Sequence, residues 1–117
     1  MTADELRVVV ETADEGVVLI RVRGSLDGWS GPSELVEALE GAARSGGRLT
    51  VADLSRLEFA DSTGLHVLLN AQRRHTETGV RLVLAGPLDT GLSRLFEVSG
   101  TIGAFTFADT VDAALSC

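Results

Sequence analysis

The stretch Phe59-Ala60-Asp61-Ser62-Thr63-Gly64-Leu65 lies where an apolar, strand-like run gives way to a run with helical periodicity. A serine at the start of a helix can accept a hydrogen bond from an unpaired backbone N–H, so the sequence predicts that Ser62 caps this helix. The same position holds a hydroxyl at the positive end of the helix dipole, where an added phosphate would be tolerated. Asp61 has two interpretations: it is a charge in the first turn that balances the dipole, or it positions Ser62 and sets the local charge that a phosphate would worsen.

The periodicity of apolar residues predicts strands and helices on both sides of this stretch. The helix that opens at Ser62 is expected to end at Gly79, and the last helix to be capped by Asp109. The expected elements are, in chain order, strands at 6–12 and 17–23, a loop at 24–31, a helix from Pro32 to Gly46, strands at 49–54 and 57–59, the helix at 62–78, a strand at 80–85, a helix after Pro87, a strand at 105–107 and the last helix.

This alternation predicts one α/β domain. The short connection between the first two strands makes them an antiparallel hairpin, and the later strand–helix–strand units require right-handed crossovers between parallel strands. The expected fold is therefore a mixed, mostly parallel sheet that the hairpin opens, with about four helices. A single domain is expected over residues 1–117, with flexible ends at 1–4 and 116–117.

The loops after the parallel strands are expected to share one surface. Strands that end at Arg23, Leu54 and Ala85 would release their loops at the same edge of the sheet, which is where sites form in open α/β sheets. The residues predicted to meet there are Asp27, Trp29, Asp61, Ser62 and the turn 86–89.

Composition excludes several classes of function. Hydrophobic residues make up 44% of the chain, which supports a real core, and the net charge of −7 argues against nucleic acid as a partner. The one cysteine, Cys117, allows no internal disulfide, and the acidic N-terminus does not resemble a signal peptide. No apolar run is long enough to cross a membrane. We therefore expect a cytoplasmic protein that does not insert into membranes.

Three motifs resemble the STAS domain, and within it the bacterial anti-sigma factor antagonists. They are Gly24-Ser25-Leu26-Asp27, Asp53-Leu54-Ser55 and the run Asp61-Ser62-Thr63-Gly64-Leu65, which follows the second motif at the spacing of the family. The resemblance covers almost the whole chain. Ser25 stands where the family often has Glu, which removes a carboxylate from this loop.

The resemblance implies a switch that is not itself an enzyme. The unphosphorylated domain would bind a kinase-type anti-sigma factor and so release a sigma factor. That partner would then phosphorylate Ser62 with its own ATP and Mg²⁺, and a PP2C-type phosphatase would reset the switch. No cofactor or metal is expected in this chain. The implied partner-binding residues are Asp27, Trp29, Asp61, Ser62, Thr63, Gly64 and Leu65.

Several residues have two interpretations. Asp27 stabilises its own loop or faces a partner, and Trp29 is a core residue or an interface anchor. Thr63 is the alternative phosphorylation site. The missing side chain of Gly64 would let a partner's backbone or nucleotide come close. His75, in a polar stretch, is expected to lie in the last turn and to favour the helix dipole.

Two other functions are compatible with the sequence. One is a STAS scaffold or adaptor subunit of a transport or signalling assembly that is never phosphorylated. The other is a small hydrolase that uses Ser62 and His66, one helical turn apart. The second is disfavoured because the strained Gly-x-Ser-x-Gly turn of serine hydrolases is absent.

Overall fold

The computed structural model describes residues 6–13, 15–27 and 32–116. Five strands, four α-helices and one short 3₁₀ helix follow one another in this part of the chain. They are β1 (Arg7–Ala13), β2 (Val17–Leu26), α1 (Ser33–Ala43), β3 (Leu49–Ala60), α2 (Ser62–Thr78), β4 (Arg81–Ala85), α3 (Thr90–Ser99), η1 (Ile102–Ala104), β5 (Thr106–Ala108) and α4 (Val111–Leu115).

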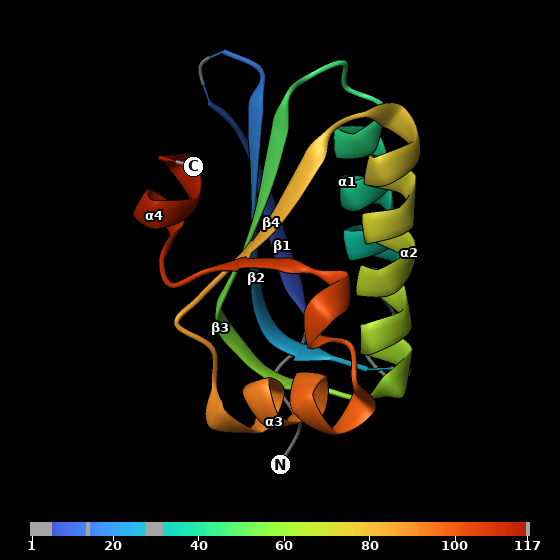
Figure 1. The fold of residues 1–117 in the computed structure, drawn as a ribbon, viewed down its shortest axis with the longest axis vertical. Helices are drawn as coiled ribbons and strands as arrows, with labels where there is room; N and C mark the ends of the chain where they lie inside the picture. Colours follow the sequence, from blue (N-terminus) through green and yellow to red (C-terminus); the bar gives the residue numbers. More distant parts are fainter. Residues whose placement is uncertain (1–5, 14, 28–31, 117) are drawn as a thin grey trace.

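The strands form one sheet in the order β1-β2-β3-β4-β5. β1 is antiparallel to β2, and every later pairing is parallel. Helices α1 and α2 cover one face of the sheet, α4 covers part of the other face, and α3 lies at the end where α2 begins (Figure 1). The predicted α/β fold, with a mixed and mostly parallel sheet opened by a hairpin, is confirmed.

The core has two parts, one on each face of the sheet. The larger part lies under α1 and α2, where Ile20 and Leu54 of the sheet pack with Leu35 and Leu68 of the helices. The smaller part lies under α4, where Ala114 is fully buried against Leu19 and Val51. Because α4 is only five residues long, it covers only part of its face.

Two strands are longer than predicted. β2 continues through Gly24 to Leu26, and β3 runs without a break to Ala60. The register of β2 against β3 shifts twice, because Arg21 pairs with Asp53 but Arg23 with Arg56, and Gly24 pairs with Leu57 but Ser25 with Phe59. Each shift places an extra residue in β3, which is the signature of a β-bulge. The bulges break the alternation of apolar residues, so the sequence pattern showed two short pieces instead of one bent strand.

Helix α2 is held to the sheet by a histidine. His75 lies in the last turn of α2, as predicted, but the expectation that it favours the helix dipole there is wrong, because its side chain is fully buried. Its Nδ1 lies 2.7 Å from the carbonyl oxygen of Ala71, and its Nε2 lies 2.9 Å from the hydroxyl of Thr50 on β3. A carbonyl can only accept, so Nδ1 donates and Nε2 accepts the Thr50 proton. Burial lowers the pKa of His75 and keeps it neutral.

Helix ends confirm one prediction and correct another. Gly79 ends α2 with φ 81°, a left-handed conformation that glycine adopts without strain. The cap of α4 is Thr110, whose hydroxyl accepts from the Ala113 N–H, and not the predicted Asp109.

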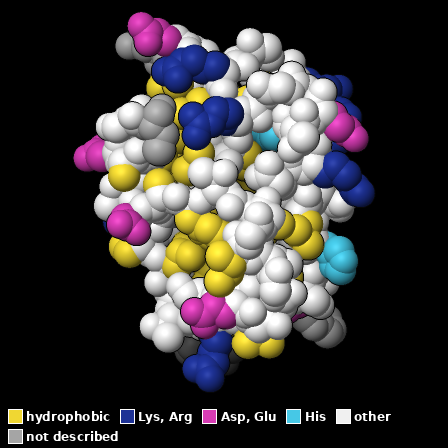
Figure 2. All heavy atoms as spheres, viewed as in Figure 1, with side chains coloured by type: hydrophobic (Ala, Val, Ile, Leu, Met, Phe, Trp, Pro, Cys, Tyr) yellow, Lys and Arg dark blue, Asp and Glu magenta, His cyan; other side chains and the backbone are white. Residues whose placement is uncertain are grey.

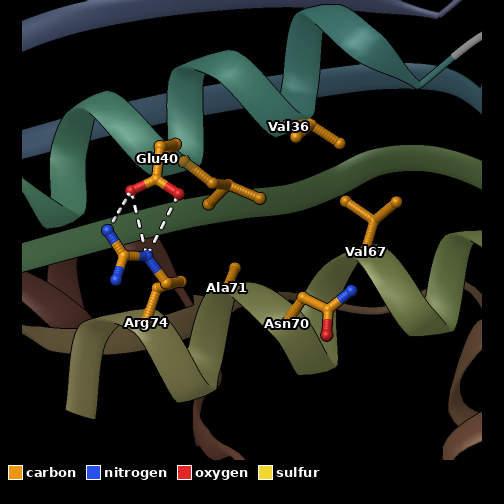
Figure 3. A pocket seen from close by; sticks show the side chains of 7 residues that line it. Val36, Glu40, Val67, Asn70, Ala71 and Arg74 are labelled. Carbon is orange, nitrogen blue, oxygen red and sulfur yellow. Dashed lines mark hydrogen bonds and ion pairs between the residues drawn. The ribbon is translucent and has the colours of Figure 1, made fainter. Parts of the chain in front are cut away.

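Helices α1 and α2 border a narrow groove on the surface (Figure 3). Val36 and Val67 line it, and at one end Arg74 of α2 donates three hydrogen bonds to the carboxylate of Glu40 on α1. These hydrogen bonds lower the pKa of Glu40. The ion pair therefore joins the two helices at the rim of the groove.

Candidate functional site

The N-terminus of α2 is capped by Asp61. This residue has an extended backbone, and its Oδ1 accepts a hydrogen bond of 3.1 Å from the Gly64 N–H. Its carbonyl accepts from the Leu65 N–H at 2.9 Å, which starts the helical hydrogen bonding. The prediction that Ser62 caps the helix is therefore wrong, because the preceding carboxylate occupies that role.

Ser62 is the first residue of α2, and its side chain is exposed. Within the described residues, its hydroxyl makes no hydrogen bond. Thr63 beside it is also exposed. The chain thus presents a hydroxyl at the positive end of a 17-residue helix without using that hydroxyl to hold the helix.

Gly64 brings the start of α2 against the end of β2. A Cβ atom at this position would lie 2.6 Å from the carbonyl oxygen and 2.8 Å from Cγ of Leu26. The Asp61 N–H donates to the same carbonyl at 3.3 Å. The absence of a side chain at Gly64 is therefore required by packing inside the domain, a reason that the sequence analysis did not give.

The residues predicted to surround Ser62 lie in different environments. Asp27 is half-buried and directly follows Leu26, so it is next to the α2 N-terminus. Leu65 is only 8% exposed and belongs to the core, so it supports the surface from beneath. Ser25, expected in a loop, is buried in β2 opposite Phe59. Trp29 lies outside the described residues.

Helix α3 borders the end of β3, a feature that the sequence pattern did not predict. β4 ends at Ala85, opposite Asp53, whereas β3 continues to Ala60. A surface groove runs between this extension and α3, with Phe59 50% exposed and Val98 80% exposed. In the sequence, only Phe59, two residues before the Asp-Ser-Thr-Gly motif, could have indicated this groove.

The predicted surface is therefore assembled in part. The end of β2 and the start of α2 are in contact, as expected from the parallel topology. Leu88, from the turn 86–89, instead lines a pocket with Phe96, Ile102 and Phe107. Figure 2 shows apolar side chains gathered in the middle of the face that carries β5 and α3.

The geometry around Ser62 does not form a nucleophile–base pair. His66 is exposed, and its Nδ1 lies 3.0 Å from the backbone oxygen of Ser62, not from the hydroxyl. Among the described residues, no three His, Cys, Asp or Glu side chains gather in a group that could hold a metal ion. No helix in the described part of the chain is long and apolar enough to cross a bilayer.

Comparisons with known proteins give the family of the chain. A family model described as "Mlab, STAS domain" matches residues 9–103. The anti-sigma-B factor antagonist of Listeria monocytogenes is 33% identical over 95 residues, which cover 81% of this chain and 82% of that protein.

Solved structures give the same result. An anti-sigma factor antagonist from Mycobacterium paratuberculosis superimposes with a TM-score of 0.78 at 30% identity, covering 96% of this chain and 92% of that one. The phosphorylated form of Bacillus SpoIIAA, at 22% identity and a TM-score of 0.71, covers 94% of this chain and 97% of its own, and supports the fold alone. The chain therefore belongs to the STAS domain family, and its similarity within that family is to anti-sigma factor antagonists.

Proposed function

We propose that this domain is an anti-sigma factor antagonist that phosphorylation of Ser62 switches off. The observation that carries the proposal is the exposed Ser62 hydroxyl at the N-terminus of α2, beside a cap that Asp61 supplies. Relatives at 33% and 30% identity that are named anti-sigma factor antagonists support the assignment.

In the unphosphorylated state, the surface around Ser62 binds a kinase-type anti-sigma factor, and a sigma factor is released. Thr63, Asp61 and Asp27 form the exposed and half-exposed part of this surface, and Gly64 and Leu65 hold it in place. Trp29, two residues after Asp27 in the sequence, is a candidate anchor for the partner. The anti-sigma factor supplies ATP and Mg²⁺, so the domain needs no cofactor of its own. All these steps take place in the cytoplasm.

Phosphorylation acts on the partner's affinity through charge. A phosphate adds nearly two negative charges, and the carboxylate of Asp61 is on the adjacent residue. The dipole of α2 tolerates the phosphate within the domain, whereas a partner that docks on this surface must bury or face it. A loss of about 2–4 kcal/mol of binding free energy, roughly thirty- to thousandfold in affinity, is enough for a useful switch. A PP2C-type phosphatase restores the binding form.

The test is intact-mass analysis after incubation with kinase-type anti-sigma factors and Mg²⁺-ATP. The wild-type protein and the Thr63→Ala variant should each gain one phosphate, and Ser62→Ala should gain none. Titration calorimetry with the same partner should show strongly reduced binding for Ser62→Asp.

Two results would contradict the proposal. Phosphate on the Ser62→Ala variant would place the modification elsewhere. Binding of a partner by wild type and Ser62→Asp with equal affinity, with no phosphate on either, would support the second function, a STAS scaffold or adaptor subunit of a transport or signalling assembly.

A further inference from the structure

Three arginines lie side by side across the first three strands. Arg7 of β1 pairs in register with Arg23 of β2, and Arg23 pairs with Arg56 of β3. Val22, the neighbour of Arg23, points into the core under α1 and α2, so the arginines project from the opposite face. This is the face on which α4 lies in Figure 1, but α4 covers only the part around Leu19.

These arginines, which we call the arginine row (Arg7, Arg23 and Arg56), are not paired with a carboxylate among the described residues. All three are exposed, and none makes an ion pair or side-chain hydrogen bond within that part of the chain. The adjacent row differs, because Arg21 pairs with Glu11 at 2.8 Å and with Asp53 at 3.1 Å. The chain therefore neutralises one row of this face and leaves the next one positive.

A β-bulge creates the row. The carboxylate of Asp53 accepts hydrogen bonds from the backbone N–H and the hydroxyl of Ser55, at 3.0 and 2.7 Å. The register shift at this point brings Arg56 opposite Arg23. Neighbouring strands lie about 4.8 Å apart, so the row spans roughly 10 Å. Like charges directly opposite one another destabilise a sheet, so the row works against the stability of the free domain.

The surroundings of the row indicate what it would bind. The arginines line one surface depression together with Val9, which is 53% exposed, and with the ion pair of Arg21 and Asp53. Guanidinium groups match carboxylates with paired hydrogen bonds, and all ten basic residues of this chain are arginines. The net charge of −7 makes the rest of the surface repel a long polyanion or an anionic bilayer that would extend beyond the row. A compact acidic segment avoids that repulsion.

We propose that the arginine row is a docking surface for an acidic segment of a partner protein, separate from the surface around Ser62. The segment would place carboxylates along the row and an apolar side chain against Val9. This proposal does not depend on the phosphorylation of Ser62, because the row lies on the face of the sheet that α2 does not cover.

The test uses fluorescence anisotropy at low salt with a labelled eight-residue peptide of alternating Glu and Thr. The row variant R7Q/R23Q/R56Q is compared with R44Q/R73Q/R81Q, which removes the same three charges from exposed positions elsewhere. We expect the row variant to bind at least about tenfold more weakly, and the control to stay within about twofold of wild type. Ser62→Asp should bind the peptide as wild type does.

Every other outcome would overturn the proposal. An equal loss in both triple variants would mean diffuse attraction by charge, and no binding of the peptide by wild type would leave the row without a function. Tighter binding of phosphatidylglycerol vesicles or of an eight-nucleotide single strand, lost in the row variant, would assign the row to phosphate-bearing ligands instead. Sedimentation experiments would identify a second copy of this chain as the occupant if the wild type alone forms dimers and the row variant is monomeric.

Discussion

At the start of α2, the side chain that stabilises the helix and the exposed hydroxyl belong to neighbouring residues. Asp61 accepts the Gly64 N–H, whereas the Ser62 hydroxyl has no such role. We expect Asp61→Ala to lower the free energy of unfolding by about 0.5–2 kcal/mol. Ser62→Ala should change it by less than about 0.5 kcal/mol. Urea denaturation followed by circular dichroism measures both, and an equal cost for the two variants would contradict the assignment of the cap.

Gly64 offers a second prediction for a single residue. A methyl group there would overlap with Leu26, so Gly64→Ala should destabilise the domain by about 1–3 kcal/mol. Gly41 is the matched control, because it is an exposed helical glycine of α1 where an added methyl group would meet no atom within 4 Å. Gly41→Ala should stabilise the domain by about 0.5–1 kcal/mol. The same denaturation experiment measures both changes in the free energy of unfolding. No change for Gly64→Ala would mean that α2 can move away from β2.

For the elements, the attachment of α2 to β3 through His75 makes stability depend on pH. Burial lowers the pKa of His75 below its ordinary value of 6.5, while the hydrogen bond to Ala71 and the charge of Glu40 oppose this shift. Below pH 6.5, the unfolded chain therefore takes up a proton that the folded domain resists. Stability should be full above this pH and should fall as the pH decreases through the window below it.

The chain has only two histidines, so His66 provides the control. Unfolding free energies measured between pH 8 and pH 5 should decrease less in His75→Gln than in the wild type, whatever the absolute stability of that variant. His66→Gln, which changes an exposed side chain, should keep the wild-type slope. Equal slopes for all three proteins would show that His75 is not the titrating group.

The elements also show how far sequence reasoning reaches. The hairpin and the face of α1 that contains Leu35 and Leu39 were predictable, because apolar spacing carries that information directly. The polar run before His75 hid its burial, although Leu68 and Ala71, seven and four residues earlier, already place it on the buried face. The full length of β3 was not predictable, because bulges break the period of two on which strand prediction depends.

For the whole molecule, the topology predicted which loops share an edge but not how far each strand extends. The contact between Leu26 and Asp61 followed from parallel strands. The groove beside Phe59 did not follow from the topology, because it requires β3 to extend beyond the end of β4. The arginine row is of the same kind: its three members are far apart in sequence, and only the register brings them together.

The capping of α2 by Asp61 has a consequence for how the domain carries information. Because the helix does not depend on the Ser62 hydroxyl, a group added there leaves the hydrogen bonds that define the shape of the domain intact. The two states would then differ in what they display and not in how they are built. Such a group would be added and removed repeatedly without refolding of the domain. Only a protein that contacts residue 62 directly would distinguish the two states.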